Sequence, residues 1–374
     1  MISNYYMPTK VLMGSDCVVR NSGLLRQLGR KALLVTGRQS AKQNGSEKDM
    51  KEALGSAGIE YAVFDRVMSN PTIACVYEGA ALARENKVDF IIGIGGGSPM
   101  DAAKAIALLA AQDIEEQDLF SGNYPNKVLP MAFVPTTAGT GSEVTPYSIL
   151  TNDQAQTKTS IASEFLFPRM AFLDARYTQS LSAVTTINTA LDALSHAVEG
   201  MLSVKASRIS DALAINSIRM IMECMPALRE SFKAGDPGKV DLRQREILLQ
   251  ASLIAGMVIA QTGTTVVHAM GYSLTYFHDI DHGRANGLLL AEYLKLVEQE
   301  NPELAGRILT GMNFSTAEEF KALTDELLGH KEALTEKEIM EYSRKTLKTK
   351  NMDNCLVKPD QEEIEQIYVS SFQS

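Results

Sequence analysis

The chain has 374 residues, 45% of them hydrophobic, and a formal net charge of −9. This length predicts two domains with sizeable cores, and the acidic balance argues against nucleic acids and anionic membranes as partners. No signal-peptide pattern opens the chain, and the four cysteines form no CxxC pair. We therefore expect a cytoplasmic protein with free thiols and no membrane span.

Residues 1–178 alternate apolar runs of strand type with segments of helical type. We predict strands at 31–36, 61–64, 89–94 and 131–134 and helices at 47–57, 73–86 and 99–111. Strands that alternate with helices indicate an α/β domain with a parallel sheet, in which ligands bind at the carboxyl ends of the strands.

Strand patterns fade in residues 179–374. Apolar residues three or four positions apart predict helices at 188–204, 209–225 and 242–259. Pro226 is expected to kink or end the second of these helices. The second domain is therefore predicted to be all-α.

A glycine-rich turn follows the predicted strand at 89–94. Gly95, Gly96 and Gly97 let the backbone approach an anion closely, and Ser98 suits an N-cap that precedes a helix. The free N–H groups and the dipole of that helix predict a pyrophosphate site. The alternative is a tight turn that binds nothing, in which Asp101 is only a capping residue.

Residues 135–143 follow the next strand and are rich in small residues and hydroxyls. We interpret this segment as a partner for phosphate and ribose, and a polar turn without a ligand is the alternative.

The end of the strand at 31–36 carries no carboxylate. An acidic residue there would bind the ribose 2′-OH of NAD, whereas cations admit the 2′-phosphate of NADP. Gly37 is followed by Arg38, Ser40 and Lys42, which suit a phosphate. We therefore predict that NADP(H) is preferred over NAD(H), with Gly37 and Ser40 near the cofactor.

Asp192 and His196 lie four residues apart among good helix formers, which places both side chains on one helix face. Taken alone, this pair is most simply a structural hydrogen bond. Three of the five histidines follow close together, at His268, His278 and His282. One carboxylate with three imidazoles suits Fe²⁺ or Zn²⁺, and the spacing leaves open whether His278 replaces one of the others.

Four motifs occur in order along the chain: Gly-Gly-Gly-Ser-Pro-Met-Asp at 95–101, Pro-Thr-Thr-Ala-Gly-Thr-Gly-Ser-Glu at 135–143, Asp-Ala-Leu-Ser-His-Ala-Val-Glu at 192–199 and His-Gly at 282–283. They resemble the iron-containing (group III) alcohol dehydrogenases, most of all the 1,3-propanediol and butanol dehydrogenases. The resemblance covers essentially the whole chain. It implies a dinucleotide-binding domain at 1–178, an all-helical metal and substrate domain at 179–374 and a cleft between them, as in dehydroquinate synthase.

The resemblance also implies roles for individual residues. It assigns the metal, Fe²⁺ or Zn²⁺, and the catalytic centre to Asp192, His196, His268 and His282. It assigns cofactor contacts to Asn70, Gly95, Gly96, Gly97, Ser98, Asp101, Thr136, Thr137, Thr140 and Lys158. It further implies a homodimer that acts on a small alcohol or aldehyde.

One position departs from the family pattern. Many members have a second histidine four residues after the third metal ligand, where this chain has Tyr272. Three routes for the proton stay open. They are the hydroxyl of Tyr272, a path through ribose and water, and His278.

We expect a metal-dependent, NAD(P)-linked dehydrogenase that transfers hydride while the metal polarises the substrate oxygen. Ile259, Val267, Tyr272 and Phe277 favour a short aliphatic alcohol, diol or aldehyde as the substrate. A metal-dependent carbon–oxygen lyase that uses NAD transiently is the alternative, but it needs a basic phosphate-binding cluster where this sequence is apolar. A nucleotide-binding protein without catalysis is disfavoured by the intact set of metal ligands.

Overall fold

The computed structural model describes residues 5–372. The chain divides into two compact units, one formed by Met7–Leu181 and the other by the remaining described residues. The sequence predicts the boundary between residues 178 and 179, and the structure divides the chain after Leu181. Tyr5 and Tyr6 belong to the second unit, where Tyr6 and the side chain of Gln261 exchange two hydrogen bonds of 2.9 and 2.8 Å.

The first unit is built on a parallel sheet, as predicted. Within the described residues, its strand order is β1-β8-β5-β4-β2-β3. The strands are β1 (Lys10–Met13), β2 (Lys31–Gly37), β3 (Glu60–Val67), β4 (Phe90–Gly95), β5 (Met131–Pro135) and β8 (Met170–Leu173). A separate antiparallel hairpin, which the sequence analysis missed, pairs β6 (Tyr147–Asn152) with β7 (Thr157–Ala162).

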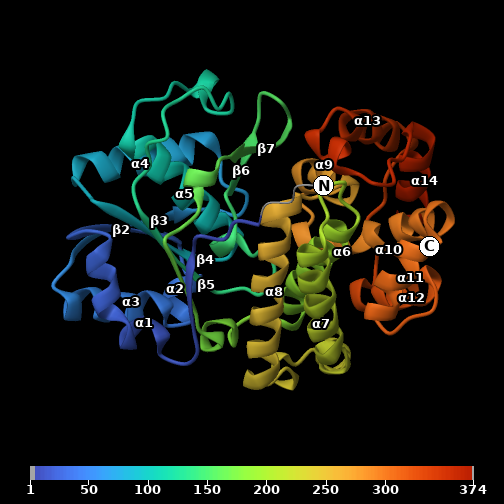
Figure 1. Ribbon diagram of the computed structural model, residues 1–374, viewed down its shortest axis with the longest axis horizontal. Coiled ribbons are helices and arrows are strands. Elements are labelled where there is room, and N and C mark those ends of the chain that lie inside the picture. Colours follow the sequence, from blue (N-terminus) through green and yellow to red (C-terminus); the bar gives the residue numbers. More distant parts are fainter. Residues whose placement is uncertain (1–4, 373–374) are drawn as a thin grey trace. The chain divides into compact units, whose positions relative to one another are not determined.

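Helices cover both faces of this sheet (Figure 1). They are α1 (Cys17–Arg20), α2 (Ser40–Gln43), α3 (Ser46–Ala57), α4 (Ile73–Glu85) and α5 (Gly97–Ala111). Alternate residues of each strand point to opposite faces, so Leu33 and Val35 of β2 pack with α4 and α5. Ala32 and Leu34 pack on the other face with α1 and α3. Both faces are therefore buried, as parallel sheets require.

The second unit is helical in its described residues (Figure 1). Its helices are α6 (Ala183–Met201), α7 (Arg208–Ala234), α8 (Leu242–Thr262), α9 (Val266–His278), α10 (His282–Glu300), α11 (Pro302–Gly311), α12 (Ala317–Leu328), α13 (Glu336–Leu347) and α14 (Gln361–Phe372). Of the two expected effects of Pro226, the end of a helix was wrong, because α7 continues through this residue and is closed by Gly235 in the left-handed conformation. Packing of the apolar face of α7 against its neighbours outweighs the lost backbone hydrogen bond.

Two glycines bring the backbones of the central helices close together. A methyl group at Gly283, in the first turn of α10, would lie 2.0 Å from the carbonyl oxygen of Asn188 on α6. A methyl group at Gly200 of α6 would lie 2.2 Å from a side-chain carbon of Val258 on α8. Neither site can hold a larger residue unless its neighbours shift, and at Gly283 the neighbour is backbone.

Within residues 5–372, no single helix is long and apolar enough to cross a membrane. The successive helices α8 and α9 reach that length and composition only as a pair, and they are bent by 109° where they meet. All four cysteines lie in the described part of the chain, and each is buried with a free thiol.

Candidate functional site

Helix α6 carries the first two residues of a candidate metal centre. Ser182 caps its start by accepting a hydrogen bond of 3.0 Å from the backbone N–H of Thr185, which fixes the helical register. Asp192 and His196 follow on one face and are only 3% and 4% exposed. The Nε2 atom of His196 lies 3.9 Å from Oδ1 of Asp192.

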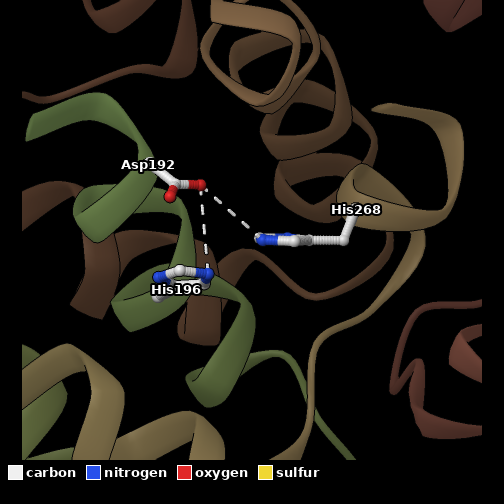
Figure 2. Close-up of side chains that lie close together, drawn as sticks. All are labelled: Asp192, His196 and His268. Atoms are coloured by element: carbon white, nitrogen blue, oxygen red, sulfur yellow. Dashed lines mark ion pairs between the residues drawn. The ribbon is translucent and has the colours of Figure 1, made fainter. Parts of the chain in front are cut away.

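Two further imidazoles face the same carboxylate oxygen. His268 lies in α9 and His282 opens α10, and their Nε2 atoms lie 3.8 and 3.9 Å from Oδ1 of Asp192. Figure 2 shows the side chains of Asp192, His196 and His268 pointing toward one another. Residues from three helices thus direct three ring nitrogens at one buried oxygen.

Asn286 shows how closely these donor atoms converge. Its Nδ2 atom lies 2.9 Å from Oδ1 of Asp192, 3.1 Å from Nε2 of His268 and 3.3 Å from Nε2 of His282. One atom at this position can therefore contact possible metal-ligand atoms from all three helices. The Oδ1 atom of Asn286 is buried and accepts no hydrogen bond from the described residues.

The charges in this cluster favour an ionised carboxylate. Burial alone raises the pKa of Asp192, but the charges of His196, His282 and His268 and the hydrogen bond from Asn286 outweigh burial and hold that pKa below its usual value. An anionic oxygen surrounded by imidazole nitrogens is a donor set for a divalent cation rather than an isolated hydrogen bond.

The residues fit a divalent metal ion. Donor atoms lie about 2.0 to 2.2 Å from Zn²⁺ in proteins, so two donors to one ion lie within about 4.4 Å of each other. The three distances from Asp192 satisfy this limit, and the possible ligand atoms of Asp192, His196 and His268 all lie within 4.8 Å of one another. One carboxylate with imidazoles suits either Fe²⁺ or Zn²⁺.

His278 belongs to a different cluster. Its Nε2 atom lies 2.9 Å from the hydroxyl of Tyr342 and 3.6 Å from a carboxylate oxygen of Glu338, both on α13. The structure therefore gives His278 partners on α13, whereas His282 lies beside Asp192.

Tyr272 lies beside the metal centre. Its ring is stacked on that of His282, with centroids 6.1 Å apart and an interplanar angle of 12°. Phe277 lies five residues further along α9, which turns it about 140° away from Tyr272. Its ring stacks on that of Tyr342, with centroids 5.2 Å apart.

The glycine turn of the first unit lies at the start of α5. We predicted Ser98 as the N-cap, but the helix begins at Gly97 and Gly96 occupies the cap position. Gly95 has a φ of +150°, and a methyl group on it would lie 2.5 Å from Pro99. Glycine at this position lets the chain pass from strand to helix within one residue, which explains the earlier start.

The predicted cofactor contacts gather around this turn. Methyl groups at Gly96 and Gly97 would lie 3.2 Å from a side-chain carbon of Thr137 and 2.8 Å from one of Thr140. Thr136 donates its N–H to the carbonyl oxygen of Gly95 at 2.9 Å. The loop at 135–143 therefore packs directly against the glycines.

Asn70 and Asp101 flank the turn on either side. The N–H of Asn70 donates to Oγ of Ser98 at 3.2 Å. The carboxylate of Asp101 accepts hydrogen bonds from Oγ of Ser142 at 2.7 Å and from the N–H of Ile149 at 3.2 Å. Lys158 on β7 is close enough to lower the pKa of Asp101, although burial raises it overall.

The end of β2 differs from the sequence-based expectation in one respect. Gly37 adjoins Ser40, as expected for one small turn. The Nζ atom of Lys42, however, lies 2.6 Å from a carboxylate oxygen of Asp65 on the neighbouring strand β3. A carboxylate is thus present near this turn, and it pairs with Lys42. Arg38, which directly follows Gly37, is exposed.

Two buried charged residues behind the glycine turn were not predicted. Lys104 is fully buried in α5, where its Nζ atom donates to Oγ of Ser142 at 2.7 Å and to the carbonyl oxygen of Tyr147 at 2.7 Å. Burial lowers the pKa of Lys104 to about 8 and raises that of the nearby buried Glu143 to about 7. The hydrogen bonds of Lys104 tie the loop at 142–147 to the helix.

Two residues of the metal centre were also missed. Asn286 lies four positions after His282 and Glu199 lies three after His196, so helical spacing placed each on the same face as a predicted ligand. Glu199 is completely buried and its carboxylate contacts Nδ1 of His268. A search for polar residues at these spacings would have found both.

Family models match both halves of the chain. Residues 8–175 match the model described as iron-containing alcohol dehydrogenase, and residues 186–372 match that of the C-terminal part of the Fe-containing alcohol dehydrogenase family. The chain therefore belongs to the iron-containing alcohol dehydrogenase family and is a metal-dependent, NAD(P)-linked alcohol dehydrogenase, an oxidoreductase that acts on CH–OH donors.

Individual relatives agree with this membership. The 1,3-propanediol dehydrogenase of Klebsiella pneumoniae is 34% identical over 330 residues, which are 84% of this chain and 81% of that protein. The NAD-dependent methanol dehydrogenase of Bacillus methanolicus is 30% identical over 288 residues, 77% of this chain and 74% of that protein. The crystal structure of an iron-containing alcohol dehydrogenase from Thermotoga maritima superposes with a TM-score of 0.92, at 39% identity and 100% coverage of both chains.

Proposed function

We propose that this chain interconverts short aliphatic alcohols or diols and their aldehydes, with Asp192, His196, His268 and His282 as the ligands of one divalent metal ion. The observation that carries the proposal is the approach of three imidazole Nε2 atoms to within 3.8 to 3.9 Å of one buried carboxylate oxygen. A bound Fe²⁺ or Zn²⁺ supplies Lewis-acid polarisation of the substrate oxygen, and the nicotinamide supplies or accepts the hydride.

The residues of the chain position these groups. Asp192 contributes the negative charge that offsets part of the charge of the cation, and the imidazoles present neutral donor atoms. His282 is the most exposed of the four side chains, at 27%, so we place the substrate on its side of the site. Tyr272 stacks on His282 and would pack against the carbon chain of the substrate, which favours a short apolar one.

The first unit would bind the cofactor. The N-terminus of α5 offers free N–H groups to the pyrophosphate, and Gly96, Gly97 and Ser98 are only partly buried. We retain NADP(H) as the preferred cofactor because no acidic side chain follows β2 directly. Because Lys42 is already paired with Asp65, we assign the main contact with the 2′-phosphate of NADP to Arg38.

Purified protein, loaded with Fe²⁺ or Zn²⁺, would be assayed with a panel of aldehydes and with NADPH and NADH. We expect turnover of short aliphatic aldehydes and a higher kcat/KM with NADPH. His268→Ala should lose both bound metal and turnover. His278→Ala is the matched control on the same helix and should keep both.

A His268→Ala protein with full metal content and activity would contradict the ligand assignment. An equal or higher kcat/KM with NADH would contradict the cofactor preference alone. Consumption of a phosphorylated sugar without net change in nicotinamide absorbance would favour the lyase. We also propose a homodimer, which light scattering of the purified protein would test.

A further inference from the structure

We propose that Glu199 is the positioning residue that selects the metal-binding tautomer of His268. The proposal rests on the ligand role given to His268 above and goes beyond it, because Glu199 would not touch metal, cofactor or substrate. It would act through the far side of the imidazole ring.

The carboxylate of Glu199 is held at a single position. Glu199 is completely buried, and its Oε1 atom accepts hydrogen bonds from the N–H and Oγ1 of Thr265, at 2.8 and 2.7 Å. The same oxygen accepts the N–H of His268 at 3.3 Å. These bonds anchor the carboxylate at the start of α9, one turn before the imidazole that it faces.

The second carboxylate oxygen, Oε2, is directed at Nδ1 of His268. An ionised carboxylate only accepts hydrogen bonds, so Nδ1 must carry the proton. Nε2 of the neutral ring then carries a lone pair and no proton, and it faces Oδ1 of Asp192 at 3.8 Å. The amide nitrogen of Asn286, at 3.1 Å from Nε2, is also a donor that requires a lone pair there.

Both sides of the ring therefore specify the same tautomer. The contact to Glu199 also fixes the plane of the ring and makes Nε2 a stronger base, which are the effects expected of a carboxylate behind a metal-binding histidine. Without Glu199, the proton can occupy Nε2 and block the position that a cation needs.

Glu199→Gln isolates this effect. The amide oxygen can still accept both hydrogen bonds from Thr265, and the residue keeps its volume. The amide NH₂ that faces Nδ1 is a donor, however, so it favours the proton on Nε2. We expect the affinity of the metal-free protein for Zn²⁺, measured by competition with a chelator, to fall about 10- to 100-fold.

Glu292→Gln is the matched control, because Glu292 is also a buried carboxylate of the second unit, 8% exposed, and it pairs with Lys295 instead of a histidine. It should leave Zn²⁺ affinity unchanged. If Glu199→Gln binds Zn²⁺ within threefold of the parent, the proposal is wrong. If His268→Ala also binds normally, the ligand assignment itself fails, so the two failures can be told apart.

The unmodified protein gives a test that no folding defect can obscure. Nitrogen-15 spectra of zinc-loaded protein with labelled histidine report which ring nitrogen of His268 carries the proton. A proton on Nδ1 is the expected result. A proton on Nε2, or metal bound through Nδ1, would overturn the proposal.

Discussion

Replacing Asp192 by Asn tests whether its carboxylate is a metal ligand. The asparagine oxygen can still accept the hydrogen bond from Asn286, which is 2.9 Å in the unmodified protein, so the helices should keep their packing. The charge and the strongest oxygen donor are lost. The variant therefore separates metal binding from folding.

The size of the effect follows from the number of ligands. A tetrahedral zinc site in a small peptide is worth about 10 to 16 kcal/mol, so one ligand in four accounts for about 2.5 to 4 kcal/mol. Each loss of about 1.4 kcal/mol weakens binding tenfold. We expect Asp192→Asn to bind Zn²⁺ about 100- to 1000-fold more weakly.

The assay is a chelator competition at fixed pH and ionic strength, with urea unfolding of the metal-free proteins alongside it. Asp174→Asn is the control, since Asp174 is a buried carboxylate of the first unit that binds Arg176. It should lower stability and leave Zn²⁺ affinity unchanged. An Asp192→Asn protein with affinity within threefold of the parent would refute the reasoning.

Three further predictions concern stability and cofactor choice. Burial raises the pKa of Glu143 to about 7, above its unfolded value, so the contribution of this group to stability is complete below about pH 4.3 and is lost as the pH rises through 7. Glu143→Gln should therefore unfold at a higher urea concentration than the parent at pH 8, and a lower one at both pH 5 and pH 8 would contradict this. Gly283→Ala should lower the free energy of unfolding by about 1 to 3 kcal/mol and weaken Zn²⁺ binding, because the added methyl group meets the backbone of α6. The control is Gly306→Ala, which should not destabilise the protein because nothing lies within 4 Å of the added methyl group. Arg38→Ala should raise the KM for NADPH more than the KM for NADH. Lys42→Ala should have a smaller effect on the KM for NADPH, because the Lys42 cation is already paired with a carboxylate. Equal effects of the two variants would argue against the role of Arg38.

Periodicity was sufficient for the main architecture. The run at 90–94 carries no polar side chain, which a strand buried on both faces tolerates, and β4 lies there. The hairpin of β6 and β7 was missed because β7 has only one fully buried residue, Ile161, and its remaining positions are polar or small. The exact start of α5 was missed because glycine removes the conformational limits on which cap rules depend.

The candidate site could be predicted only in part for a related reason. Spacing along one helix places Asp192 and His196 together, but it does not show which distant histidine approaches them. The resemblance to a family supplied His268 and His282, while the choice between His282 and His278 needed the positions of α10 and α13. Pairings across neighbouring strands, such as Lys42 with Asp65, are likewise invisible in the linear sequence.

The contact of Gly283 with Asn188 has a consequence for how this centre can evolve. The main chain of α10 approaches that of α6 there with no side chain between them, so backbone atoms set the separation of the two helices at this point as long as residue 283 is glycine. Exchange of one donor side chain for another can then change the preferred ion while the scaffold stays the same.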